Sequence, residues 1–311
     1  MSDFIDKTLI QELTTPVPHE IAQFAEAIAY KMGEPPLGIL FYGSLLREVD
    51  PTGILDFYVI TEKPASLSGN PFARFANRVL PPNVYYMEHQ TEAATLRAKV
   101  AVLSQEQFLR RGTLFSLDTT IWARFCQPVR LVWVRNGRAA DRILQALRQC
   151  LITASCWAAL LGPKEGEAID YWRTLFAHTY AAELRVEKKG RGHKLLKGRE
   201  ERYEALLKAS WQQAGLSYQT NNETLRPYLT ASSRKKAAKN WQKIAAYGRP
   251  LNLSRLIKAA FTFKDGVSYL LWKIQRHTGK QVHVFTFERK HPILTLPFFL
   301  WRARHFRKTT K

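Results

Sequence analysis

The chain has 311 residues, enough for two domains of ordinary size, and 46% of them are hydrophobic, which is typical of a globular protein. No run approaches the roughly 18 apolar residues that a membrane-spanning helix needs, and the acidic N-terminus resembles neither a secretion signal nor an arginine-rich presequence, so we expect a cytoplasmic protein. Three cysteines without metal-ligand spacing predict reduced, buried thiols, and the scattered histidines argue against a zinc site.

The positive charge is concentrated at one end of the chain. The formal net charge is +21, of which residues 234–311 carry +17, from 19 Lys or Arg against two acids. The preceding 233 residues carry only +4, from 28 basic against 24 acidic residues. This distribution predicts an anionic partner for the C-terminal quarter, either nucleic acid or a membrane rich in anionic lipid.

The first 136 residues mix helical and strand patterns. Residues 18–31 have the periodicity of a helix. Strands are predicted at 38–42, 54–60, 84–87, 97–103 and 129–134. Ser104 to Arg111 predicts a helix that begins with a capping box between Ser104 and Gln107. We therefore expect a domain with a mixed sheet over residues 1–136.

From residue 137 onward the pattern is mainly helical. Helices are predicted at 138–161, 165–188, 200–213, 234–247, 253–261 and 267–277. A polar loop is predicted at 217–223, a hairpin or linker strand at 281–287, and an apolar segment with a basic tail at 292–306. The expected fold class is α+β, with a helical domain at 137–233 and a basic C-terminal region at 234–311.

The turn at Tyr42-Gly43-Ser44 is followed by Asp56 in the apolar run Leu55-Asp56-Phe57-Tyr58-Val59. A tight Gly-Ser turn lets backbone N–H groups and a hydroxyl approach a triphosphate, and a nearby carboxylate can hold the divalent cation that neutralises it. The combination favours a nucleotidyltransferase of the DNA polymerase β type. Such enzymes have a second acid two residues on, where this chain has Tyr58, so any further metal ligand must come from elsewhere.

Three other charged positions allow two interpretations each. Lys99 and Arg124 stand among apolar residues and can contact either solvent or phosphate. Glu183, on the predicted helix 165–188, can form a surface pair with Arg185 or serve the site.

Taken in order, these segments resemble the mitochondrial-type phosphatidate cytidylyltransferases, also called translocator assembly and maintenance proteins, which have bacterial members. The resemblance covers about residues 38–279. It rests on Tyr42 to Leu45, Leu55 to Phe57, Asn83 to Met87, Arg97 to Ser104, Trp122 to Val129, Ala177 to Arg185, Ile257 to Thr262 and the basic helix at Ser268 to Lys273. The family also lacks the second acid after the aspartate. This chain departs from the family pattern at Met87, Gln127 and Glu183, which leaves open whether the substrate differs.

The resemblance implies that CTP and phosphatidate react to give CDP-diacylglycerol and pyrophosphate, with Mg²⁺ or a similar cation. It implies that Gly43 and Ser44 hold the nucleotide phosphates and that Asp56 ligates the metal. Lys99 and Arg124 would pair with nucleotide or lipid phosphate, and Glu183 would complete the metal shell.

Because phosphatidate lies in a membrane, the resemblance also implies a peripheral protein on the inner face of the cell membrane. The apolar segment ending at Trp301, with Arg302 and Arg304 after it, has the pattern of an interfacial anchor. The alternative is that this segment packs on the protein's own core.

Two other functions stay open. Nucleotidyl transfer could have another phosphate or hydroxyl acceptor, or the chain could be a non-catalytic nucleic-acid-binding protein that uses Trp241, Tyr247 and Trp272 beside basic residues. The apolar segment 292–301 favours a membrane, so a nucleic-acid partner is not expected. The sequence leaves the oligomeric state, the metal and the acyl-chain preference undetermined.

Overall fold

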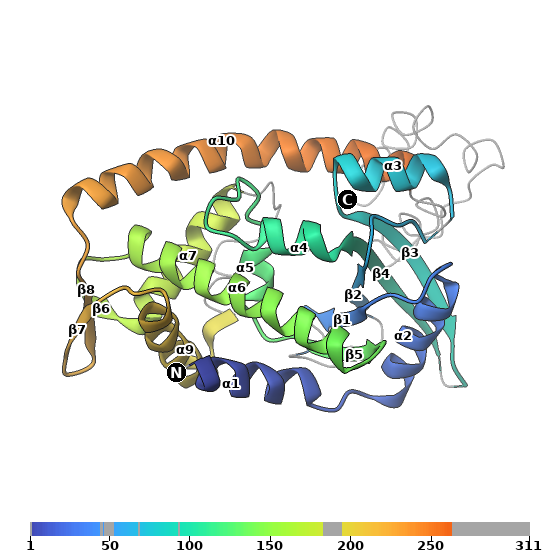
Figure 1. The fold of residues 1–311 in the computed structure, drawn as a ribbon, viewed down its shortest axis with the longest axis horizontal. Helices are drawn as coiled ribbons and strands as arrows, with labels where there is room; N and C mark the ends of the chain where they lie inside the picture. The colour runs from blue at the N-terminus through green and yellow to red at the C-terminus, as the bar shows by residue number, and fades with distance from the viewer. Residues whose placement is uncertain are drawn as a thin grey trace, which may run out of the picture.

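The computed structural model describes residues 2–43, 46, 53–67, 69–92, 94–182 and 195–262. Figure 1 shows a sheet toward one end of the molecule and a group of helices toward the other, with helix α10 (Ala231–Thr262) running along both. The expected α+β fold class, a mixed sheet followed by a helical part, is confirmed.

The sheet contains all five predicted strands in the order β3-β4-β2-β1-β5. The strands are β1 (Gly38–Tyr42), β2 (Ile54–Thr61), β3 (Asn83–Gln90), β4 (Thr95–Ser104) and β5 (Arg130–Val134). Strands β2 and β4 are parallel, and the other neighbours are antiparallel. The parallel pair places Asp56 of β2 beside Lys99 of β4.

One face of the sheet is covered by helix α2 (His19–Lys31). Phe24 and Ile28 of this helix pack against alternate strand residues such as Phe57, Val59 and Val100, and all five side chains are fully buried. Because side chains alternate between the two faces of a strand, Asp56 and Lys99 belong to the opposite face.

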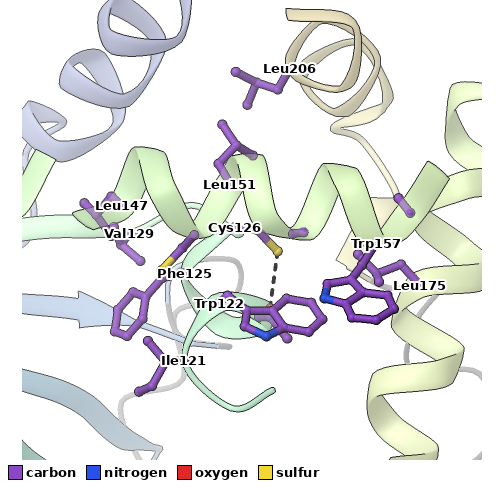
Figure 2. Packing of buried hydrophobic residues seen from close by; sticks show 14 of the residues in the cluster. Ile121, Trp122, Phe125, Cys126, Val129, Leu147, Leu151, Trp157, Leu175 and Leu206 are labelled. Carbon is purple, nitrogen blue, oxygen red and sulfur yellow. Dashed lines mark hydrogen bonds between the residues drawn. The ribbon is translucent and has the colours of Figure 1, made fainter. Parts of the chain in front are cut away.

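The opposite face packs against α1 (Ser2–Thr14), α4 (Gln105–Arg111), α5 (Trp122–Phe125) and α6 (Gly137–Leu161). Figure 2 shows Phe125 and Trp122 of α5 against Leu147, Leu151 and Trp157 of α6. The same cluster continues into the helical region, so the core is continuous across the predicted boundary at residue 136. The three predicted domains stay a prediction.

Helix α6 is the central helix of the fold. By length and hydropathy it could span a membrane, which the sequence pattern did not anticipate, but 61% of that apolar window is buried inside the protein. Its neighbours include α1, α4, α5, α10 and the two helices α7 (Ala168–Ala182) and α9 (Glu200–Gln213). The surrounding helices explain why α6 is apolar, because they remove its side chains from water.

Helix α10 corrects the prediction of two helices at 234–247 and 253–261, because it continues through Pro250. Arg234 fixes its beginning by donating to the carbonyls of Gly162 and Pro163 at 2.8 and 3.0 Å. Trp241 packs with its ring centroid 5.1 Å from that of Trp157, 6.3 Å from that of Trp122 and 5.6 Å from that of His178. The predicted elements at 267–277, 281–287 and 292–306 lie outside the described residues.

The end of α10 is fixed by a group of charges that we call the α10 anchor, namely Arg255 and Lys258 with Asp118 and Arg111. The Arg255 guanidinium donates to Pro81 O at 2.7 Å and to both Asp118 oxygens, and Arg111 Nε lies 3.5 Å from Asp118 Oδ2. Burial opposes ionisation of Asp118, but Arg255, Thr120 and Arg111 together outweigh it and lower the pKa of the carboxyl below its usual value.

Lys258 completes the anchor. Its Nζ donates to the carbonyls of Leu80 and Pro82 and, at 2.9 Å, to Asn83 Oδ1. The anchor therefore joins α10 to the segment that leads into β3.

Three further differences from the sequence prediction concern local structure. The predicted loop 217–223 forms a hairpin of β7 (Tyr218–Asn221) and β8 (Thr224–Pro227), which pairs with β6 (Gly166–Glu167). Helix α7 begins at Ala168, three residues later than the predicted 165, and residues 183–194 are not described. Helices α1, α3 (Pro71–Val79) and α5 were not predicted.

Candidate active site

The candidate site begins where β1 ends. Gly43 follows Tyr42 with φ +102°, a backbone conformation that favours glycine. A methyl group at this position would lie 2.9 Å from Asp56 Oδ2, so the carboxylate lies directly against the glycine backbone. The structure thus joins the two parts of the sequence motif, Gly43 and Asp56. Ser44 lies outside the described residues, and its role stays a prediction.

A row of four side chains crosses the sheet at this level. Tyr42 on β1 is the register partner of Asp56 on β2, Asp56 is the partner of Lys99 on β4, and Lys99 is the partner of Tyr86 on β3. Register partners share a face of the sheet. Asp56 and Lys99 are both half-buried, so both side chains are accessible from that face of the sheet.

Arg124 approaches the same row from α5. Its Nη1 donates to Tyr58 Oη at 3.1 Å and to Thr120 O at 3.0 Å, and its guanidinium lies over the Tyr42 and Tyr58 rings at 5.4 and 5.7 Å. Tyr58 stands two residues after Asp56 on the same face of β2. The position at which nucleotidyltransferases of the DNA polymerase β type carry a second acid therefore holds, in this chain, a phenol that orients a cation.

A narrow pocket lies beside this arginine. It is lined by Tyr42, Gly43, Leu46, Arg124, Gln127, Pro128 and Arg199. Gln127, where the resembled family has lysine, donates to Ala123 O at 2.9 Å and lines the pocket as a neutral amide. Arg199, just before α9, brings a cation to the same pocket. No sequence motif marked Arg199, because it follows a turn at Gly198 in another part of the chain.

The adjacent residues of β3 and β4 add charge that sequence reasoning missed. Tyr86 Oη donates to Glu88 Oε1 at 2.6 Å, and Arg97 Nε lies 3.4 Å from the same oxygen. Burial, assisted by this bond to Glu88, raises the pKa of Tyr86, which keeps the phenol protonated. Met87 points to the other face of the sheet, where it packs against the buried residues that lie between α2 and the strands. Its departure from the family pattern therefore lies away from the row.

A divalent cation fits this site only in part. Within the described residues, no group of three or more His, Cys, Asp or Glu side chains could hold a metal ion. Mg²⁺, however, is commonly held by one or two carboxylates together with substrate phosphates and water. Asp56 meets that minimum.

Several predicted site residues lie outside the described part of the chain. Glu183 follows Ala182, the last described residue of α7, and it is itself not described. The predicted anchor residues Trp301, Arg302 and Arg304 also fall beyond the described part of the chain. The roles of these four residues stay predictions.

The three cysteines are not part of the candidate site. Cys126 and Cys150 are buried, Cys156 is partly buried, and all three are free thiols. Burial raises the pKa of Cys126 to about 12 and that of Cys156 to about 11, so these thiols stay protonated.

Comparisons with known proteins add little to this geometry. No protein-family profile matches the chain, and no curated protein matches it. Among solved structures, a nucleotidyltransferase-like protein from Exiguobacterium sibiricum 255-15 aligns over 91% of this chain and 92% of its own, with 14% identity and a TM-score of 0.27.

Proposed function

We propose that this chain is a metal-dependent nucleotidyltransferase that transfers a cytidylyl group from CTP to phosphatidate, giving CDP-diacylglycerol and pyrophosphate. The observation that carries the proposal is the contact of Asp56 with the Gly43 turn, flanked by Lys99 on the neighbouring strand. Arg124, Arg199 and the half-buried Lys99 make the surroundings of the carboxylate cationic. Such a site suits a triphosphate.

Each residue has a distinct task in this proposal. Asp56 would hold Mg²⁺, which when bound neutralises charge on the nucleotide phosphates. The glycine backbone at 43 allows phosphate oxygens to approach closely, because no side chain intervenes. Tyr58 and Thr120 fix the Arg124 guanidinium before substrate arrives, so little reorganisation accompanies the reaction.

The acceptor follows from chemistry and from the sequence resemblance together. A phosphate monoester is already anionic at neutral pH, so it can attack the α-phosphorus without a general base. Positioning and charge neutralisation would then supply most of the rate. Phosphatidate is the acceptor that the resemblance implies, and the cations around Asp56 support an anionic acceptor of this kind.

The decisive experiment measures transfer of label from α-labelled CTP to phosphatidate in detergent micelles with Mg²⁺, Mn²⁺ or Co²⁺. We expect lipid-soluble label, and we expect Asp56→Asn to reduce the rate at least about 100-fold. The matched control is Asp141→Asn, which makes the same chemical change at an exposed position of α6. Thermal unfolding of both variants verifies that they are folded.

Two outcomes would reject parts of the proposal. If folded wild-type protein forms no lipid product with any of the cations, phosphatidate is not the acceptor. Parallel reactions with glycerol 3-phosphate and with RNA ends then test other acceptors. If Asp56→Asn retains the wild-type rate, the site itself is wrong, and RNA binding without turnover would favour the non-catalytic alternative.

A further inference from the structure

A cationic groove separates α3 from α4 at the end of the sheet, beyond the last residues of β2. It measures about 610 Å³ and is lined by Lys63, Pro64, Pro71, Arg74, Phe75, Arg78, Glu106, Gln107 and Arg110. Asp56 is the third residue of β2, whereas Lys63 follows the end of that strand at Thr61. The groove is therefore distinct from the candidate active site.

Buried polar contacts fix the two walls of this groove. Gln107 Nε2 of α4 donates to Asn77 O of α3 at 2.9 Å, and Asn77 Nδ2 donates to Val102 O of β4 at 2.7 Å. Asn83 Nδ2 holds the carbonyl of Ala73 at 2.6 Å. Gln107 also completes the capping box with Ser104. The groove is thus preformed.

The charges in the groove are unbalanced. Lys63, Arg74, Arg78 and Arg110 face one carboxylate, Glu106, and all five side chains are exposed. Within the described part of the chain, none of the four cations forms a side-chain hydrogen bond or an ion pair. In the α10 anchor, by contrast, the arginines are paired with Asp118. Four unpaired cations in one groove are suited to an anionic partner.

The outer side of α3 is apolar and exposed to solvent. Phe72, Phe75 and Val79 are 62%, 63% and 64% exposed, whereas Ala73 and Asn77 face the protein. Their spacing places the three apolar side chains on one face of the helix, beside Arg74 and Arg78. A helix with an apolar face and a basic flank has the pattern of an element that lies on a membrane surface.

From these observations we infer that the α3–α4 groove docks on an anionic phospholipid surface, with the four cations on headgroup phosphates and Phe72, Phe75 and Val79 at the acyl boundary. A nucleic acid could bind the four cations through its phosphates, but it would not bury the exposed aliphatic side chain of Val79. The chain's own residues 263–311 are strongly basic, so their charge opposes binding in this groove. The inference goes beyond the proposed function and does not depend on it.

The test is co-sedimentation of the full chain with vesicles of phosphatidylcholine containing 30% phosphatidylserine, at matched ionic strength. Neutralising the groove with Arg74→Gln plus Arg78→Gln should weaken binding about 25-fold, because each basic side chain at an anionic surface contributes about fivefold. The matched control is Lys235→Gln plus Lys236→Gln, which removes the same charge from exposed positions near the start of α10. Phe72→Ser plus Phe75→Ser should also weaken vesicle binding but leave RNA binding unchanged.

The remaining outcomes would overturn the inference. Equal losses in the groove pair and the control pair would show that only total charge matters. Loss of RNA binding with unchanged vesicle binding would assign the groove to nucleic acid. Saturable binding of inorganic phosphate that is lost in the groove pair, together with unchanged vesicle binding, would assign the groove to free phosphate. The proposed transfer activity is assayed in detergent micelles, without vesicles. A failure of that assay and a failure of vesicle docking can therefore be told apart.

Discussion

The candidate active site and the α10 anchor both contain charged side chains inside the protein, but the partners of those charges differ. In the anchor, Asp118 lies between Arg111 and Arg255, and Lys258 Nζ donates to carbonyl oxygens. In the site, Tyr58 and Thr120 orient Arg124 through neutral oxygens, and these contacts do not neutralise it. The charges of the anchor therefore stabilise the fold, whereas the charges of the site are the ones that the proposed function uses to bind its substrates.

The largest expected effect tests the anchor. Asp118→Ala would leave Arg111 and Arg255 partly buried without their carboxylate, which should lower the free energy of unfolding by about 3–5 kcal/mol. Urea unfolding measures this change. Glu204→Ala, which breaks an exposed pair with Lys208, should cost less than about 1 kcal/mol. Equal costs for the two variants would contradict the structural role of the anchor.

Gly43→Ala tests the contact between the turn and Asp56. The positive φ should cost about 1 kcal/mol of stability, and the added methyl group should displace the carboxylate and lower the transfer rate about tenfold or more. Gly215→Ala is the control, since Gly215 also has a positive φ but has open space around it. We expect the two variants to lose similar stability while only Gly43→Ala loses activity, measured by the CTP assay.

Tyr58→Phe separates orientation from stability. Losing the phenol that accepts from Arg124 should cost about 1 kcal/mol of stability and lower kcat about tenfold. Tyr171→Phe is matched, because Tyr171 Oη donates a buried bond to Leu225 O at 2.6 Å far from the site. A Tyr58→Phe enzyme with full kcat would show that the phenol does not position Arg124 for catalysis.

The smallest expected effect is the acid dependence of the anchor. The pKa of Asp118 is lower in the folded state than its usual value near 3.8, so the unfolded chain binds more protons between those two values. The ion pair therefore stabilises the fold above about pH 4, and this stability is lost as the pH falls through the lowered pKa. Urea unfolding from pH 5 to pH 2 should show a steeper loss for the wild type than for Asp118→Asn.

Much of the sheet could be predicted from the sequence, because the patterns that mark its strands lie within short stretches of the chain. Strand β1 has the predicted ends, and the capping box of Ser104 and Gln107 is present. Gly43 and Asp56 could be related to each other because a short motif contains both. Their physical contact, however, depends on the antiparallel pairing of β1 with β2.

The parts that could not be predicted depend on distant contacts. Helix α10 continues through Pro250, where local propensity predicts a break, and tertiary bonds from Arg234 and Arg255 hold both of its ends. A Cβ at Gly248 would lie 2.7 Å from Ala182 O, so this glycine serves close packing and not a turn. The bond between Arg124 and Tyr58 joins residues 66 positions apart, and no sequence pattern marks it.

The packing of Trp241 gives this protein an internal optical reporter. Its indole lies close to those of Trp122 and Trp157 at steep interplanar angles of 65° and 66°, an arrangement expected to give exciton-coupled circular dichroism and rapid energy transfer. His178, at 5.6 Å from the same ring, is placed to quench its fluorescence when protonated. Separation of α10 from the core would therefore change the near-ultraviolet spectrum without any added label.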